Sequence, residues 1–301
     1  MTKKIVVTGG AGFIGSHIVD HLIEQDQQVI VLDNFSTGKK ENKNPKATYI
    51  YCDLSSIDQK ELNSYTKDCS VVFHCAALPN VQYSIDYPYE SNKANVDITI
   101  KILESIRYNN IQKIIYSSSS SVYGNAQQIP TTETESIKPL SPYALQKYIG
   151  EQYCLLYHQL YNIQCIILRY FNVYGDRMTD KGSYVSVLSH FFKAIKNNQP
   201  LNIVNDGEQT RDFINVNDVV QANIAAMNNN ISFETLNIGY GNYYSINEIA
   251  ELFNTSRQYK ESRIEPQHTL ADISKAKELL SWQPKIDLKT WIGEKLDAIH
   301  K

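Results

Sequence analysis

Apolar and polar positions alternate along the chain in two periods, and these predict strands that are followed by helices. Residues 3–9 form a short β-branched run, residues 15–26 space their apolar side chains as a helix does, and residues 27–34 form a second strand ending in an acid. Further strands are predicted over residues 47–54, 70–77, 112–119 and 164–175, and helices over 89–109 and 141–161. This alternation predicts parallel βαβ units in a doubly wound α/β sheet with helices on both faces.

After about residue 172 the pattern loosens into shorter elements, with apolar runs over residues 201–204, 212–227 and 235–240. We therefore expect a first domain over residues 1–172 and a smaller α/β lobe over 173–301, interleaved with the first. Ligands of doubly wound sheets bind beyond the carboxyl ends of the strands. The residues that directly follow each strand are therefore the candidates for a site.

Composition narrows the class of partner. The 301 residues carry a net charge of -3 with no basic segment, which argues against nucleic acid and anionic membranes and favours a small molecule. No leader peptide is recognisable, and no apolar run approaches the roughly 20 residues of a membrane span. Five cysteines without a CxxC pair indicate reduced thiols in a cytoplasmic protein and no metal site.

A glycine-rich segment follows the first predicted strand directly and opens a helix. Gly9, Gly10, Gly12 and Gly15 allow a tight turn and a close approach of the backbone to a pyrophosphate, which then faces the helix amino terminus. Asp33 ends the second strand, where its carboxylate can accept both ribose hydroxyls of an adenosine and would repel a 2′-phosphate. The segment predicts NAD binding; the alternative is that the glycines merely form a turn.

Asp53 and Leu54 follow the third predicted strand and are placed to contact the adenine. Asp53 could equally cap the next helix. Both interpretations stay open at this point.

Tyr143 and Lys147 are four residues apart, so on a helix both side chains project from one face. Ser141 and Pro142 are typical of the cap and first turn of a helix, which places the pair close to a helix start. A free phenol has a pKa near 10, and a neighbouring ammonium lowers that value, so the pair can act as an acid and base. Such pairs also arise by chance, and the surrounding motifs must decide.

The motifs "TGGAGFIG", "HCAA", "SSSSSVYG", "YALQK", "RYFNVYG" and "QTRDFINVNDVVQA" occur in this order, and "ADISKAKELLSWQP" follows near the carboxyl terminus. In this arrangement the chain resembles the extended short-chain dehydrogenase/reductase family, and within it the nucleotide-sugar epimerases of the UDP-glucose/UDP-N-acetylglucosamine 4-epimerase group. The resemblance implies a Rossmann fold, tightly bound NAD, and a homodimer formed through helices at residues 89–108 and 142–161.

By the same resemblance, Tyr143 is the acid and base, Lys147 binds the nicotinamide ribose and tunes Tyr143, and Ser119 binds the reacting sugar hydroxyl. Asn95 matches an asparagine that supports this network. The implied NAD contacts are Gly9, Gly12, Phe13, Ile14, Gly15, Asp33, Asn34, Ser36, Thr37, Gly38, Asp53, Leu54, Cys75, Ala76, Leu78, Asn95, Tyr143, Lys147 and Phe171.

The resemblance also implies a substrate site. Its candidate residues are Ser119, Tyr143, Asn172, Tyr184, Val185, Arg211, Arg263 and Thr269. Arg211 would pair with the diphosphate, although it could instead form an internal ion pair with Asp212. Arg263 is the candidate for a second diphosphate arginine, with Glu265 on the uridine ribose, in a segment one residue shorter than the family pattern. Thr269 matches a gatekeeping position, where a small residue leaves room for a 2-acetamido group.

Two departures from the family's other branches set the expected substrate. Dehydratases carry an Asp-Glu pair and decarboxylases a Glu where this chain has Ser120 and Ser121, and a hydroxyl cannot replace those acids. Relatives acting on UDP-glucuronate have a Thr where this chain has Asn172, and a second Arg where it has Thr179. We therefore expect a UDP-hexose 4-epimerase for UDP-GlcNAc and UDP-GalNAc, and also for UDP-Glc and UDP-Gal. The alternatives are a UDP-glucuronate 4-epimerase and a non-catalytic NAD-binding regulator.

Overall fold

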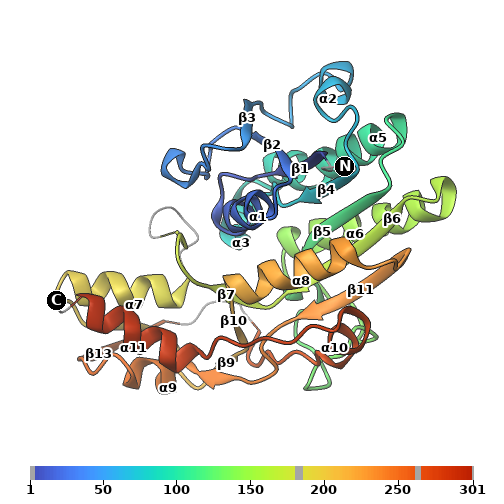
Figure 1. Ribbon diagram of the computed structural model, residues 1–301. Helices are drawn as coiled ribbons and strands as arrows, with labels where there is room; N and C mark the ends of the chain where they lie inside the picture. Colours follow the sequence, from blue (N-terminus) through green and yellow to red (C-terminus); the bar gives the residue numbers. More distant parts are fainter. Residues whose placement is uncertain (1–3, 180–185, 262–265, 300–301) are drawn as a thin grey trace.

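The protein, seen here as a computed structural model, is described over residues 4–179, 186–261 and 266–299. A parallel sheet of seven strands lies at its centre, in the order β11-β6-β5-β4-β1-β2-β3 (Figure 1). The strands are β1 (Lys4–Thr8), β2 (Gln28–Asp33), β3 (Thr48–Tyr51), β4 (Val71–His74), β5 (Lys113–Ser119), β6 (Gln164–Tyr170) and β11 (Phe233–Ile238). The chain order reverses between β1 and β4, so a crevice is expected beyond the carboxyl ends of these two strands.

Helices cover both faces of this sheet. One face packs against α1 (Phe13–Glu24), α8 (Val216–Asn228) and α10 (Ser274–Leu280). The other packs against α2 (Gln59–Tyr65), α5 (Ile98–Tyr108) and α6 (Pro142–Tyr161). The inner strands β1 and β4 are buried on both faces and are almost entirely apolar, whereas the edge strand β3 is partly exposed. The predicted doubly wound α/β fold is therefore confirmed.

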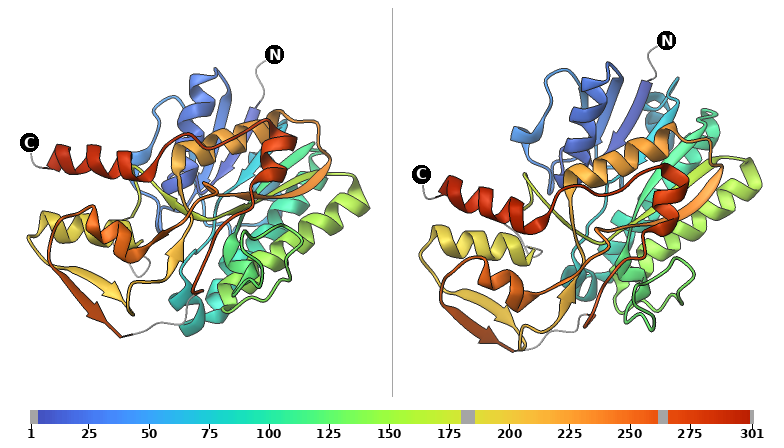
Figure 2. Two further views of the ribbon diagram at one scale, coloured as in Figure 1. Left: turned by 90° about the horizontal axis from the view of Figure 1, so that it is seen from below. Right: turned by 60° about the horizontal axis from the view of Figure 1, so that its bottom comes forward.

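A smaller lobe lies beside the sheet and is seen from two sides in Figure 2. Its helices are α7 (Val187–Lys196), α9 (Ile246–Glu251) and α11 (Leu288–Ile299). Its strand pairs are β7 (Asn172–Tyr174) with β10 (Phe213–Asn215), β9 (Thr210–Arg211) with β12 (Tyr244–Ser245), and β8 (Leu201–Val204) with β13 (Arg257–Lys260). Aromatic side chains, including Phe191, Phe253 and Trp291, fill its core.

One predicted strand is two strands in the structure. β6 ends at Tyr170, and the peptide N–H of Phe171 still bonds to Ile238 O on β11. The N–H of Asn172 turns to Asp212 O instead, and β7 continues into the smaller lobe. Conversely, α8 and β11 follow residue 173 but belong to the main sheet and its cover. The chain beyond residue 172 thus serves both parts, and the division at that residue stays a prediction.

Short helices connect these elements. They are α3 (Val81–Asp86), α4 (Pro88–Asn92), the 3₁₀ helices η1 (Lys40–Asn42) and η3 (Ser120–Tyr123), and the π-helix η2 (Lys93–Asp97). α4, η2 and α5 follow one another without a break, and Asn95 lies in the wider π turn. Over the described ranges no helix has the length and apolar character needed to cross a membrane.

Candidate active site

The glycine segment forms the turn between β1 and α1, and two of its glycines are sterically required. Gly9 has φ +69°, and a Cβ there would lie 2.8 Å from Ala76 N, in the loop that follows β4. A Cβ at Gly15 would lie 2.3 Å from Gly9 O. Among the described residues no side chain caps the amino terminus of α1, whose N-cap residue is Gly12. Its first N–H groups are therefore oriented as a phosphate cradle requires.

Asp33 is held rigidly at the end of β2. Its Oδ2 accepts the N–H of Ala11 at 2.9 Å and its Oδ1 accepts the N–H of Phe35 at 2.7 Å. Each carboxylate oxygen keeps further capacity to accept a hydrogen bond, so the group can still receive two ribose hydroxyls. The following loop carries Asn34, Ser36, Thr37 and Gly38, and a Cβ at Gly38 would meet Ala11 Cβ at 2.9 Å.

Asp53 does not cap the next helix. Its Oδ1 accepts hydrogen bonds from Ser55 N and Ser55 Oγ, which closes a local turn after β3. Asp58 is the cap of α2, because its carboxylate accepts the N–H groups of Lys60 and Glu61. The interpretation of Asp53 as a helix cap is therefore wrong. The adenine contacts of Asp53 and Leu54 stay a prediction.

A buried polar chain joins the glycine turn to the π-helix. Thr8 Oγ1 lies 2.7 Å from His74 Nδ1, and His74 Nε2 lies 3.1 Å from Thr99 Oγ1, which donates to Asn95 O. Burial lowers the pKa of His74 to about 3, so the ring is neutral and bonds to a hydroxyl on each side. Thr8 Oγ1 also accepts the N–H of Ala76. This row of hydrogen bonds thus fixes the spacing between the carboxyl ends of β1 and β4.

Asn95 ties the loop after β4 to α6. Its Oδ1 accepts the N–H of Leu78 at 2.7 Å, and its Nδ2 donates to Gln146 Oε1 at 2.8 Å. Ser91 Oγ donates to the same Gln146 oxygen at 2.8 Å. Gln146 lies between Tyr143 and Lys147 in sequence, so these contacts help to fix the rotation of α6. The supporting role expected for Asn95 is compatible with this placement.

Tyr143 and Lys147 lie on the buried side of α6, near its amino terminus. Ser141 caps the helix through Ala144 N, as predicted, and Ser84 Oγ accepts the N–H of Tyr143 at 3.0 Å. Lys147 Nζ donates to Ser117 O at 2.8 Å and lies 5.1 Å from the centre of the Tyr116 ring. Burial lowers the pKa of Lys147 to about 8. The start of α6, which carries Tyr143 and Lys147, is therefore attached directly to β5.

The serine run is ordered structure, and its members have different partners. Ser118 Oγ donates to Glu151 Oε1 at 2.5 Å, and Glu151 forms a buried ion pair with Arg169 at 2.6 Å. Ser119 ends β5, and its Oγ accepts the N–H of Ser121 at 3.2 Å, which leaves the Ser119 hydroxyl hydrogen available to a ligand. This stretch is the last part of β5 and the start of η3.

The smaller lobe brings three predicted substrate residues close together, with Asn172 on β7, Arg211 on β9 and Thr269 in the segment beside them. Arg211 Nη1 donates to Thr210 O at 2.9 Å and to Gln267 O at 3.3 Å. Asn172 Nδ2 donates to Asp212 O at 3.0 Å and lies 3.4 Å from Thr269 Oγ1. The Asp212 carboxylate accepts three backbone N–H groups, and no ion pair joins it to Arg211, both residues being described.

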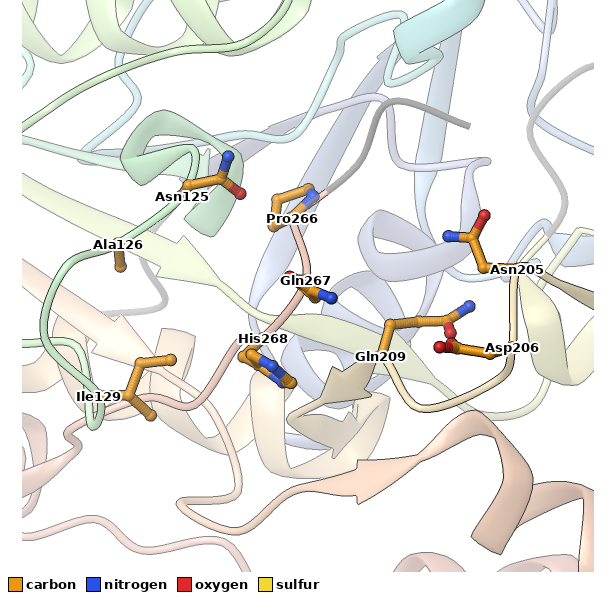
Figure 3. A pocket seen from close by; sticks show the side chains of 9 residues that line it. All are labelled: Asn125, Ala126, Ile129, Asn205, Asp206, Gln209, Pro266, Gln267 and His268. Carbon is orange, nitrogen blue, oxygen red and sulfur yellow. The ribbon is translucent and has the colours of Figure 1, made fainter. Parts of the chain in front are cut away.

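A cavity of about 350 Å³ lies beside these strands (Figure 3). Figure 3 shows Asn125 and Ile129 on one side and Asn205 and Asp206 on the other. Its third side, residues 266–268, is joined to β9 by a contact of 3.1 Å between Thr210 Oγ1 and His268 Nδ1. The cavity thus adjoins the segments that carry Arg211 and Thr269.

Several predicted residues need separate mention. Phe171 is buried between η3 and the segment around Ala271. Tyr184, Val185, Arg263 and Glu265 lie outside the described residues. Ser84 and Gln146 were not predicted from the sequence, and Ser117 was expected only as part of a strand. Only the position of Gln146 inside "YALQK" gave a signal, because the other two contacts join segments far apart in sequence.

Comparisons with known proteins agree with this geometry. The family model described as the NAD dependent epimerase/dehydratase family matches residues 5–239. A Methanocaldococcus jannaschii protein named provisionally as a UDP-glucose 4-epimerase is 46% identical over 96% of this chain and 95% of its own length.

Two solved structures are similar over nearly their whole length. A UDP-glucose 4-epimerase of Thermotoga maritima with UDP-glucose has a TM-score of 0.94 at 35% identity, covering 99% of this chain and 100% of that one. A UDP-N-acetylglucosamine 4-epimerase of Methanobrevibacter ruminantium with UDP-N-acetylmuramic acid has a TM-score of 0.92 at 38% identity, covering 98% and 97%.

Proposed function

The chain belongs to the NAD dependent epimerase/dehydratase family and is an NAD-using UDP-sugar 4-epimerase, and from that premise we propose that it interconverts UDP-GlcNAc with UDP-GalNAc and UDP-Glc with UDP-Gal. One observation carries the proposal. The bond from Lys147 Nζ to Ser117 O attaches the helix of Tyr143 to the strand of Ser119.

The residues present fit NAD. A Cβ at Gly9 or Gly15 would fill the turn through which the backbone approaches a pyrophosphate. Asp33 is a buried carboxylate oriented by two backbone N–H groups, which suits a ribose diol and disfavours a 2′-phosphate. When bound, NAD supplies the acceptor and later the donor of the hydride at the sugar C4.

The chain's own residues would then move one proton. Tyr143 takes the proton of the sugar 4-hydroxyl and returns it to the 4-keto sugar after that sugar has turned over. The Lys147 ammonium favours the phenolate of Tyr143 by its charge. Ser119 holds the reacting hydroxyl through the hydrogen that its contact with Ser121 leaves free. No net oxidation results, so the enzyme is an isomerase.

A neutral hexose is favoured over a sugar acid. Arg177, two residues before the position where relatives acting on UDP-glucuronate carry arginine, forms an ion pair with Asp20 on α1 at 2.7 Å. It is therefore committed to a contact within the protein. Ser120 and Ser121 supply no carboxylic acid for elimination. Thr269, a small residue beside Asn172, supports room for a 2-acetamido group.

A homodimer is also part of the proposal. α6 and the helix formed by α4, η2 and α5 expose large apolar side chains, including Tyr89, Tyr108, Leu156 and Leu160, which are 47 to 71% exposed. A second copy that packs the same helices against these would bury them. Light scattering should therefore give twice the chain mass, and Leu156→Glu with Leu160→Glu should give the monomer. We place the enzyme in the cytoplasm, in keeping with its unpaired cysteines.

The decisive experiment is direct. Purified protein without added NAD is incubated with UDP-GlcNAc and, separately, with UDP-GalNAc, UDP-Glc and UDP-Gal, and the products are separated by chromatography. We expect each sugar to approach a mixture with its 4-epimer. Complete absence of interconversion for all four sugars contradicts the proposal.

A further inference from the structure

Asp212 is a fully buried carboxylate whose partners are all backbone N–H groups. It lies between β9 and β10 with 0% of its surface exposed. Its Oδ1 accepts Tyr240 N at 2.7 Å, and its Oδ2 accepts Gly241 N at 3.1 Å and Ala271 N at 3.0 Å. One side chain therefore connects three chain segments that are far apart in sequence.

The backbone of Asp212 reaches two predicted substrate residues. Its carbonyl oxygen accepts both the N–H of Asn172 and Asn172 Nδ2, each at 3.0 Å. Its N–H lies 3.4 Å from Thr269 Oγ1. Arg211 is the preceding residue, and the N–H of Thr269 bonds to Thr210 O at 3.1 Å. The candidate diphosphate residue Arg211, the substrate candidate Asn172 and the gatekeeping residue Thr269 are thus arranged around this single position.

Gly239 makes the close packing at Asp212 possible. A Cβ at Gly239 would lie 2.7 Å from Asp212 Oδ2 and 2.6 Å from Ala271 Cβ. Any larger residue would push the carboxylate away from the segment that it holds. The end of β11, the 271 segment and β9 therefore pack at a fixed distance from one another.

Burying the Asp212 carboxylate lowers the stability of the fold unless its hydrogen bonds compensate. Taking a carboxylate out of water is unfavourable, and here burial raises the pKa of Asp212 to about 6 although three N–H groups oppose that rise. Asp218, in the following helix, is a useful contrast. It is also buried, its Oδ2 accepts Ile286 N and its backbone oxygen accepts Trp282 Nε1, each at 3.0 Å, and neither Ile286 nor Trp282 is a substrate candidate.

We propose that Asp212 is a positioning residue of the nucleotide-sugar site. Its carboxylate holds the turn at residues 240–241 and the segment at 269–271 against β7 and β9, and so sets the relative places of Asn172, Arg211 and Thr269. This inference rests on the proposed function, because it takes those three residues to be substrate contacts. It assigns Asp212 no contact with the substrate itself.

Asp212→Asn tests this role with nearly unchanged volume. An amide turns one acceptor into a donor that faces a backbone N–H, so at least one of the three bonds is lost. We expect the KM for the UDP-hexose and the Kd for UDP, measured by calorimetry on the NAD-loaded protein, to rise roughly tenfold or more. The kcat should change little, because Asp212 acts on binding and not on the proton transfer.

Asp218→Asn is the matched control. It should lower the urea midpoint about as much as Asp212→Asn does and leave both KM and the UDP affinity unchanged. If Asp212→Asn fails to fold, Gly239→Ala displaces the carboxylate without removing its charge, and it should give the same rise in KM.

The outcomes separate the two proposals. Normal KM and UDP affinity in both Asp212→Asn and Gly239→Ala overturn the positioning role, as does an equal KM rise in Asp218→Asn. A wild-type protein that binds UDP but converts none of the four sugars overturns the proposed function alone, and the calorimetric comparison still decides the role of Asp212.

Discussion

The Lys147 ammonium donates a hydrogen bond to the backbone carbonyl of Ser117 at 2.8 Å. This contact joins the helix start that carries Tyr143 to the end of β5, where Ser119 ends the strand. Because the bond uses a backbone carbonyl, the side chain of Ser117 is free to contact Cys75 Sγ at 3.4 Å, beside the glycine turn. The candidate cofactor residue Cys75 and the candidate sugar residue Ser119 therefore lie around one strand end.

Tyr143→Phe should remove nearly all turnover while NAD stays bound. The substitution deletes the phenolic proton carrier, whose loss typically costs about 10²- to 10⁴-fold in rate. It keeps the N–H that bonds to Ser84, so α6 should stay in place. Turnover numbers and the NAD content of the purified variant are measured together. Near-normal turnover would remove Tyr143 from its assigned role.

Lys147 should make stability depend on pH in the alkaline range. Burial lowers its pKa from 10.5 to about 8, so between these values the unfolded chain holds a proton that the folded protein lacks. The free energy of unfolding should therefore rise with pH across that window, by up to roughly 3 kcal/mol. Lys147→Met should abolish this rise. Urea midpoints at pH 7.5 and 9.5 check it, and equal pH slopes in both proteins would refute it.

How far the sequence predicts the site depends on the distance over which each contact acts. The glycine turn, Asp33 and the Tyr143–Lys147 spacing are local patterns next to predicted strand and helix ends, and the structure places them as expected. The contacts of Asp212 cross 28 to 59 positions, so no periodicity reports them. The Asp53 alternative failed for a local reason, because Asp58 directly precedes α2 and caps it.

Replacing either Glu151 or Arg169 alone should lower the free energy of unfolding by more than the ion pair itself contributes. Arg169 Nε and Nη2 both donate to Glu151, which also accepts Ser118 Oγ, and both charged side chains are buried. Arg169→Met leaves a buried carboxylate without its cation and should cost about 3–5 kcal/mol. Replacing Glu151 by Leu in the same chain should recover part of that loss. Urea midpoints of the single and double variants decide this, and additive losses would contradict it.

Thr269→Tyr should narrow the sugar pocket. The phenol would occupy space beside Asn172 Nδ2, from which Thr269 Oγ1 is now 3.4 Å away. Conversion of UDP-GlcNAc should fall by about 10²-fold or more, since excluding its 2-acetamido group raises the activation free energy by several kcal/mol. Conversion of UDP-Glc should stay within a few-fold of the wild-type rate. Thr269→Ser serves as the control and should keep both activities. Equal loss for the two sugars would place the gatekeeping position elsewhere.

The most direct test of the account follows the hydrogen at the sugar C4. UDP-GlcNAc carrying deuterium at C4 is incubated with the purified protein in ordinary water without added NAD, with Tyr143→Phe as the inactive control, and the UDP-GalNAc formed is examined by mass spectrometry. Because the hydride leaves C4 and returns to the same carbon, the product should keep its deuterium. Product that has lost the label to water, or no product at all, would contradict the account.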